Sequence, residues 1–196
     1  CIIEDDYDSE FRLTGRPIPT MMGIDVGGRV IYMNTFAKTL TPTIRISYMV
    51  LPEQLVREFH EKLGFYSCTV SNFEQYTLAR FIQDGYFEKH INRMRNSYRK
   101  RREALLKAMK AGGLLARADI LERGSGLHFL LRFHTQKSDE QLEQELAAHG
   151  IRMRPLRDYY AGEAPAARHI FVLNYSGMEA SVLPEAIARI TACLGA

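Results

Sequence analysis

The residue best suited to covalent chemistry in this sequence is Lys38, which follows a short apolar and aromatic run. Residues 30–33 have the composition of a buried strand, and the polar pair Asn34 and Thr35 follows them. An amine held among apolar groups is desolvated, so its pKa falls and it can attack a carbonyl to form a Schiff base. Taken alone, the stretch favours a simpler interpretation, in which the lysine extends from a strand end into water.

Two polar side chains flank this lysine at spacings that suit a phosphate group. Thr35 lies three residues before Lys38, and Arg45 lies seven residues after it. A hydroxyl and the paired donors of a guanidinium both bind phosphate oxygens well. The alternative interpretation is that Arg45 pairs with a carboxylate at the protein surface.

A second stretch, at the start of the chain, runs from apolar residues into acidic ones. On an extended chain Asp5 and Tyr7 point to the same face. A carboxylate can pair with a protonated ring nitrogen, and a phenol can donate a hydrogen bond to a ring oxygen. Pyridoxal phosphate, whose aldehyde combines with a lysine, needs such partners. A solvated strand end is the alternative interpretation of this run of charges.

These stretches closely resemble the effector-sensing domain of MocR-type regulators of the GntR superfamily. Such regulators join a winged-helix DNA-binding domain to an aminotransferase-like domain of fold type I. The acidic run at 4–11 points to the regulators more than to ordinary aminotransferases. The similar segments cover most of the chain and are residues 4–11, 28–42, 44–52, 75–82, 85–91 and 126–129.

The resemblance implies a role for each of these side chains. Lys38 resembles the catalytic lysine that forms the internal aldimine with pyridoxal phosphate. Asp5 resembles the partner of the pyridinium nitrogen, and Tyr7 resembles the donor to the ring's phenolic oxygen. Thr35 and Arg45 resemble phosphate ligands. Relatives often have a serine directly before the lysine, where this chain has an alanine, so one possible phosphate contact is missing.

Arginines in the last third of the chain are candidates for binding the carboxylate of an amino compound. Fold type I proteins often place an arginine in this region, and a bidentate guanidinium suits a carboxylate. Arg157 matches by its position in the resemblance, and Arg154 is the second candidate. Arg152 and Arg154 share one strand face, so only part of the cluster, which also includes Arg168, can point inward. A solvated surface position is the competing interpretation for each arginine.

The composition is that of an ordinary globular protein, with 196 residues, 46% of them hydrophobic and 25% charged. This length allows one substantial core, or one core and a small second domain. The net charge of +3 is too small to argue for nucleic acid by itself. No apolar run is long enough for a bilayer, and the histidines lack metal-ligand spacing, so we expect neither a membrane span nor a metal. Three widely spaced cysteines favour a reducing, cytoplasmic setting.

The hydrophobic patterns predict an α/β fold with a small α/β domain at its C-terminal end. The resemblance implies that the part before this domain is the C-terminal part of a fold type I, aminotransferase-like large domain. We expect the large-domain part at 1–85, a long inter-domain helix at 86–112 and the small domain at 113–196. Residues 12–28 are predicted to form a loop. Strands are predicted near the start of the chain and at 30–35, 45–50, 116–122, 127–133, 151–155 and 170–175, and helices at 52–63, 73–83, 86–110, 138–149 and 183–194. Gly64 is predicted to end the first of these helices, and Ser138 with Gln141 forms a capping box at the start of the fourth. The long helix is predicted from an apolar stripe that contains Ile91, Leu105 and Met109.

The sequence leaves three functions open. In the first, an amino-acid-like effector displaces Lys38 from pyridoxal phosphate and changes DNA binding by a winged helix outside this chain, with little or no turnover. In the second, the chain is a class I/II aminotransferase in which Lys38 carries a proton. In the third, it is an inert fragment without a cofactor.

The chain begins inside an apolar strand, so we expect it to be the C-terminal piece of a longer protein. The preceding part would then supply the rest of the cofactor site. The resemblance also implies a homodimer, because sites of this type are built between subunits. We expect the regulator, with pyridoxal 5'-phosphate as its cofactor.

Overall fold

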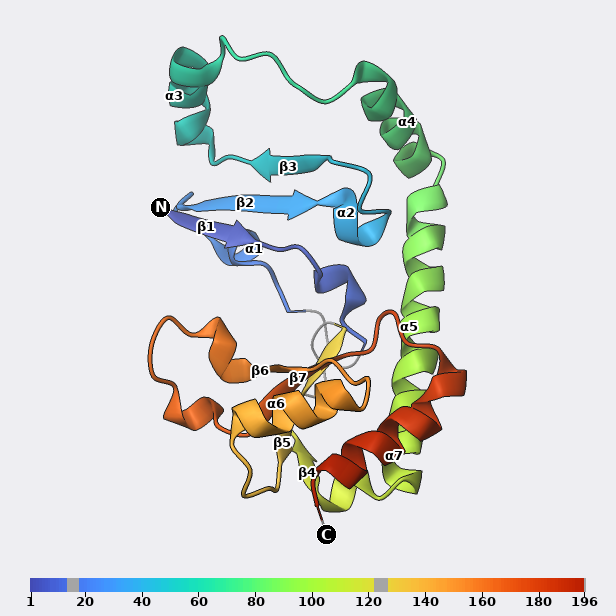
Figure 1. The fold of residues 1–196 in the computed structure, drawn as a ribbon. Helices are drawn as coiled ribbons and strands as arrows, with labels where there is room; N and C mark the ends of the chain where they lie inside the picture. The colour runs from blue at the N-terminus through green and yellow to red at the C-terminus, as the bar shows by residue number, and fades with distance from the viewer. Residues whose placement is uncertain (14–17, 122–126, 196) are drawn as a thin grey trace. The chain divides into compact units, whose positions relative to one another are not determined.

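A computed structural model describes residues 1–13, 18–121 and 127–195. The chain forms two compact units, Cys1–Met94 and Arg95–Ala196, which are described separately below. Their boundary falls inside one long helix, α5 (Tyr86–Ala111), so α5 supplies residues to both units (Figure 1). In the described ranges, none of the helices combines the length and apolar character that a bilayer span requires.

The first unit is built on a three-stranded sheet with β2 (Val30–Thr35) in the middle (Figure 1). Strand β1 (Ile2–Asp5) pairs with β2 in parallel, and β3 (Ser47–Val50) pairs with it antiparallel. The observed bounds of β2 are the predicted ones. Strand β3 begins two residues later than predicted, because β2 turns into a helix after Thr35 and leaves residue 45 without a strand partner.

The predicted loop at 12–28 contains a short helix, α1 (Met21–Ile24). The hydroxyl of Thr20 accepts the N–H of Gly23 at 2.9 Å. The carboxylate of Glu4, on β1, accepts the N–H groups of the first two helical residues at 2.7 and 2.9 Å. The N–H groups of a helix's first turn have no hydrogen-bond partners inside the helix. In α1 the carboxylate of Glu4, which is distant in sequence, supplies the missing acceptors. Residues 14–17 of the predicted loop lie outside the described residues.

Helices α3 (Glu53–Leu63) and α4 (Asn72–Gln83), together with α5, agree with their predicted bounds to within one residue. Gly64 ends α3 as predicted, and its N–H donates to the carbonyl of His60 at 3.0 Å. The loop before β2 is fixed at Gly28, whose φ of +60° favours glycine and whose carbonyl accepts a hydrogen bond from the side chain of Gln54.

The second unit has a four-stranded antiparallel sheet in the order β4-β5-β7-β6. The central strands are β5 (His128–Phe133) and β7 (Ile170–Asn174), and the edges are β4 (Ala118–Ile120) and β6 (Arg154–Pro155). Along β5 every second side chain, from Phe129 to Phe133, is buried. Both edge strands are shorter than predicted, since each has only one partner strand. Residue 122, the predicted end of the first edge strand, lies outside the described residues.

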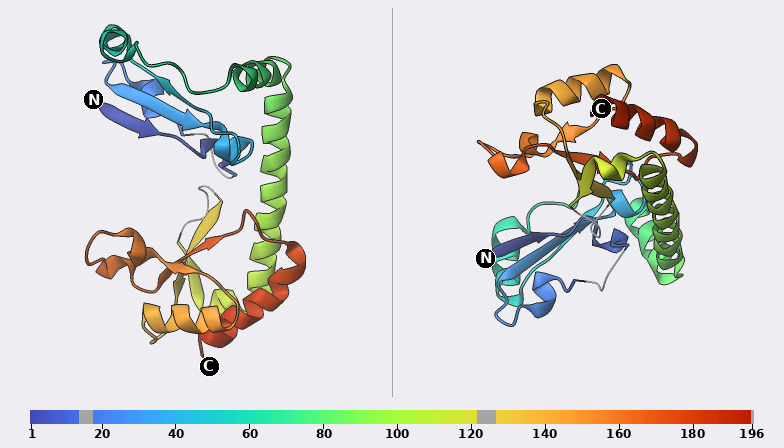
Figure 2. Two further views of the ribbon diagram at one scale, coloured as in Figure 1. Left: turned by 45° about the horizontal axis from the view of Figure 1, so that its top comes forward. Right: turned by 90° about the horizontal axis from the view of Figure 1, so that it is seen from below.

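Helices α6 (Asp139–Ala148) and α7 (Leu183–Cys193) lie side by side in this unit (Figure 2). The capping box predicted for α6 is present, because Ser138 and Gln141 each accept the other's backbone N–H, at 3.2 and 3.0 Å.

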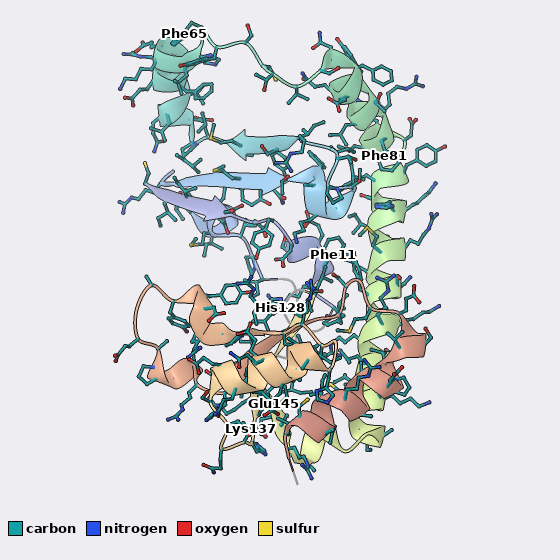
Figure 3. The ribbon with its side chains drawn as sticks, viewed as in Figure 1. Phe11, Phe65, Phe81, His128, Lys137 and Glu145 are labelled. Atoms are coloured by element: carbon teal, nitrogen blue, oxygen red, sulfur yellow. The ribbon has the colours of Figure 1, made fainter. Side chains whose placement is uncertain are left out.

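Lys137 donates to Glu145 on α6 and, at 2.7 Å, to the last carbonyl of α7. Figure 3 labels Lys137 and Glu145 at this junction. Short 3-10 helices complete the chain at Ser9–Phe11, Leu114–Ala116, Leu156–Tyr159, Pro165–Ala167 and Ala180–Val182.

Candidate functional site

The predicted cofactor ligands come from segments that meet at one edge of the first unit's sheet. Asp5 is the last residue of β1, and Lys38 follows the end of β2. The carboxyl ends of parallel strands share an edge, which is where α/β sheets bind ligands. Asp5 pairs in register with Met33, two residues before Thr35. Thr35 pairs with the first residue of β3, so Arg45, just before that strand, belongs to the same edge.

Lys38 lies in a four-residue helix, α2 (Phe36–Thr39), that begins where β2 ends. The ring of Phe36, two residues before the lysine, packs against Tyr48 on β3 and Phe87 on α5, with centroid distances of 5.5 and 5.8 Å. The sequence prediction placed the lysine at a strand end and missed this helix. The signal that could have found it is Thr35, a residue type favoured at helix N-caps.

The hydroxyl of Thr35 is already engaged in two hydrogen bonds. Its oxygen accepts the N–H of Ala37 at 3.2 Å, which caps α2. Its proton is donated to the carbonyl of Ile46, also at 3.2 Å. A hydroxyl has a single proton to donate. As a phosphate donor, Thr35 would therefore have to exchange the Ile46 carbonyl for a phosphate oxygen.

The other four predicted ligands, Asp5, Tyr7, Lys38 and Arg45, have exposed side chains. Within the described ranges none of the four forms a side-chain hydrogen bond or an ion pair. Two expectations change as a result. The surface carboxylate considered as a partner for Arg45 is not found there, and the described residues do not desolvate the ammonium of Lys38. These groups are accessible to a ligand.

Tyr7 does not share a strand face with Asp5, contrary to expectation. Strand β1 ends at Asp5, and the chain then bends into the 3-10 helix that starts at Ser9. The carboxylate of Asp6 accepts the hydroxyl of Ser9 at 2.9 Å, which closes the turn. The period-two alternation therefore stops before Tyr7, whose predicted role now depends on the geometry of the turn.

A hydrogen-bonded chain of polar side chains, which the sequence prediction missed, connects the turn after β1 with the end of β2. Tyr32 donates to the carboxylate of Asp6 at 2.9 Å, and Asn34 donates to the hydroxyl oxygen of Tyr32 at 2.9 Å. The same amide group reaches Glu10 at 3.4 Å, and its oxygen accepts the N–H of Thr35 at 2.6 Å. Asn34 is only 4% exposed. The missed signal is an asparagine within a strand whose other residues are mostly apolar.

Burial raises the pKa of the Tyr32 phenol above its ordinary value. The hydrogen bond from Asn34 acts in the opposite direction, and the neighbouring carboxylate of Asp6 raises the pKa further. The phenol therefore remains protonated near neutral pH. It is a permanent donor to Asp6 rather than an acid that titrates.

In the second unit, Arg157 is surrounded by carboxylates. Its guanidinium forms an ion pair with Glu140 and lies 3.7 and 3.8 Å from the carboxylate oxygens of Asp139 and Asp158. The hydrogen bond with Glu140 is the main cause that raises the pKa of Arg157. The guanidinium predicted to bind a ligand's carboxylate therefore already has carboxylate partners.

The surroundings of Arg157 are partly buried and partly open. The side chain of Asp139 is 3% exposed and accepts the backbone N–H of His169 at 2.9 Å. A pocket of about 590 Å³ opens beside Arg157 and is also lined by Glu163 and Arg168.

Arg154, the second candidate, is exposed on the edge strand β6. Arg152 is also exposed, while Met153 between them is buried. Strand β6 begins only at Arg154, so the shared strand face of the two arginines stays a prediction.

The family described as aminotransferase class I and II matches residues 8–190 of the chain. The chain belongs to this family, and its fold is that of the pyridoxal-phosphate-dependent fold type I proteins. A kynurenine aminotransferase from Pyrococcus horikoshii, solved in complex with PMP, has a TM-score of 0.81 and 27% identity, over 98% of this chain and 47% of that chain. The predicted α/β aminotransferase-like fold is thereby confirmed.

Several of the curated relatives are helix-turn-helix regulators. The chain is 41% identical to the uncharacterised HTH-type transcriptional regulator YdeL of Bacillus subtilis (strain 168), over 97% of the chain and 41% of that protein. It is 38% identical to the probable rhizopine catabolism regulatory protein MocR of Rhizobium meliloti, over 95% of the chain and 37% of that protein. The predicted resemblance to MocR-type regulators is confirmed, and the chain spans about two fifths of the length of these relatives.

Pyridoxal phosphate is the cofactor of this fold family, and the donor set at the sheet edge fits it. The edge offers an amine for the aldehyde, a carboxylate for the ring nitrogen and a guanidinium for the phosphate, on Lys38, Asp5 and Arg45. All three are accessible and without side-chain partners in the described part of the chain. This chemistry matches the requirements of the cofactor.

Proposed function

We propose that this chain is the effector-sensing part of a MocR-type transcriptional regulator that acts as a cytoplasmic homodimer. The observation that carries the proposal is a pyridoxal-phosphate donor set on one sheet edge in a chain 41% identical to a helix-turn-helix regulator. The sensed compound would be amino-acid-like. DNA would be bound by a winged helix in a part of the protein outside this chain.

Bound pyridoxal phosphate supplies an aldehyde that combines reversibly with amines. The amine of Lys38 would hold the cofactor covalently. The carboxylate of Asp5 would keep the proton on the ring nitrogen, and the phenol of Tyr7 would donate to the ring oxygen. Arg45 would donate paired hydrogen bonds to the phosphate. The hydroxyl of Thr35 would also donate to the phosphate, in place of its present bond to the Ile46 carbonyl.

The effector would need an amine to replace that of Lys38 and a carboxylate that meets a cation. Arg157 is the proposed cation and Arg154 the alternative. A carboxylate that binds Arg157 would have to take the place of Glu140, its present partner. Arg154 has no carboxylate partner among the described residues, so it would bind without such an exchange.

An effector can change DNA binding only through a difference in its affinity for two states of the protein. Release of Lys38 by the effector would contribute to that difference, because the lysine side chain is then no longer held by the cofactor. Little or no turnover is required of such a sensor.

The test uses the full-length protein with pyridoxal phosphate added. We expect a visible absorbance band of the bound cofactor in the wild type and its complete loss in Lys38→Ala. Lys62→Ala is the matched control, because Lys62 is an exposed lysine on α3 paired with Glu58 at 2.6 Å. A band that persists in Lys38→Ala, or one that disappears in the control, would refute the assignment of the site.

A second candidate function is an aminotransferase. It is favoured by the similarity to the Pyrococcus horikoshii enzyme at a TM-score of 0.81 and 27% identity. In that case Lys38 would move a proton between the substrate and the cofactor. Conversion of an amino donor and a keto acid at about 1 to 1,000 turnovers per second would support the enzyme. Effector-dependent DNA binding without such turnover would support the regulator.

A further inference from the structure

A hydrogen-bonded chain links the two segments that carry the cofactor ligands. We call Asp6, Tyr32 and Asn34 the polar chain. Tyr32 and Asn34 lie on β2 and point to the face opposite Met33, while Asp6 lies in the turn after β1. The bonds run in one direction, from the Asn34 amide to the Tyr32 oxygen and from the Tyr32 proton to the Asp6 carboxylate, each at 2.9 Å.

Each member of the polar chain has hydrogen-bond partners on its neighbours in the structure. Asp6 accepts from Ser9 as well as from Tyr32, both at 2.9 Å, and its backbone N–H donates to the carbonyl of Met33 at 2.9 Å. Asn34 is buried, so any displacement that broke its bonds would leave a polar group without water. Asp6 and Tyr32 are half-buried, and a satisfied polar network that includes a buried member favours one geometry.

One end of the polar chain is a single bond away from the segment of Lys38. The side-chain oxygen of Asn34 accepts the N–H of Thr35 at 2.6 Å, and Thr35 caps the helix that contains Lys38. The other end is Asp6, which directly follows Asp5 and directly precedes Tyr7. The polar chain therefore touches both segments of the site although none of its members is a proposed ligand.

We propose that the polar chain is the positioning element of the cofactor site. It would fix the end of β1 and the turn after it, which carry Asp5 and Tyr7, against the end of β2 and the start of α2, which carry Thr35 and Lys38. Tyr32, Asn34 and Asp6 are positioning residues in this role. The inference rests on the proposed function, since it needs a cofactor to be bound at this edge.

The experiment measures pyridoxal phosphate binding by full-length Tyr32→Phe, which removes only the central hydroxyl. We expect the dissociation constant to rise about five- to tenfold. The midpoint pH of the bound-cofactor absorbance is also expected to shift. Tyr48→Phe is the matched control, because within the described residues the hydroxyl of Tyr48 makes no hydrogen bond. A purely structural role would lower the unfolding temperature and leave both cofactor readouts unchanged, which would overturn the proposal.

Two further variants keep the test decisive if Tyr32→Phe folds poorly. Ser9→Ala removes one of the two hydroxyl donors to Asp6 at an exposed position and should weaken cofactor binding by about twofold. Asp6→Asn combined with Tyr32→Phe should cost less than the sum of the two single changes, because they break the same bond. Additive effects, or an unchanged Ser9→Ala, would contradict the inference. Absence of the cofactor band in the wild type would instead defeat the proposed function, and the inference with it.

Discussion

The two units of this protein bury different kinds of side chains. In the described part of the first unit, the buried apolar residues are Phe11, Val30, Pro52 and Ile91, and the polar Asn34 and Thr39 are buried with them. The second unit has an extended apolar core, to which its sheet and its helices both contribute. Its members include Leu105, Met109, Phe129, Leu131, Phe133, Leu142, Leu146, Phe171, Ile187 and Ile190.

Within this chain alone, the two units are stabilised by different interactions. Apolar burial dominates in the second unit. In the first unit, strand pairing and the polar chain hold the ligand-bearing segments, while large side chains such as Phe65 and Phe73 remain exposed (Figure 3 labels Phe65). Segments that bind ligands are commonly drawn from the less stable parts of a protein.

Separating the units is expected to have the largest effect. Residues 86–196, which keep the whole of α5 and the apolar core, should unfold in one cooperative transition. Residues 1–111, which also keep α5 but bury few apolar groups, should unfold gradually. Urea unfolding followed by circular dichroism measures both. If residues 1–111 unfolded cooperatively at the same urea concentration as residues 86–196, the proposed difference between the two units would be contradicted.

A matched pair of phenylalanines tests the same contrast within the intact chain. Phe171, on strand β7 of the second unit, is fully buried, and Phe65 is 75% exposed in the first. Phe171→Ala should lower the free energy of unfolding by about 3–5 kcal/mol. Phe65→Ala should change it by less than about 0.5 kcal/mol. If both variants lost the same free energy of unfolding in urea, the difference in side-chain exposure would not reflect a difference in stability between the two units.

The smallest expected effect on stability concerns the ion pair between Glu140 and Arg157, a charged interaction at the surface of the second unit. The pKa of Glu140 is held below its ordinary 4.5, chiefly by its own backbone N–H at the start of α6 and next by Arg157. A lowered pKa in the folded state stabilises the protein above the unfolded value, and this stabilisation is lost as the pH falls through the folded value.

Glu140→Gln should therefore be slightly less stable than the wild type near neutral pH. The difference should disappear in acid well below pH 4.5. Urea unfolding of both proteins at the two pH values measures it. A difference that grows in acid would have the wrong sign and would exclude this ion pair as its source.

Long periodic elements could be predicted from the sequence because their signals are local. The stripe that contains Ile91, Leu105 and Met109 predicted α5 to within one residue, and the Ser138 capping box predicted the start of α6. Helix α1 could not be predicted, because the carboxylate that completes its first turn comes from β1. The edge strands were predicted too long, since their length depends on which neighbour they pair with.

The candidate site was predicted only as far as residue types and spacing allow. Lys38 and Asp5 could be selected because their chemistry and the family resemblance agree. The bond from Tyr32 to Asp6 could not, since it joins residues 26 positions apart and depends on strand register. The carboxylates around Arg157 were missed for the same reason: Glu140 meets it only after α6 and the following loop have folded.

The helix that carries Lys38 is too short to persist by itself, since helix nucleation fixes several residues for a single hydrogen bond. Its order comes from the ring of Phe36, which contacts Tyr48 and Phe87, and from the Thr35 cap. The conformational entropy of this segment is therefore lost during folding and not when a ligand arrives. A cofactor that meets such a preorganised amine binds more tightly than one that must order a flexible loop.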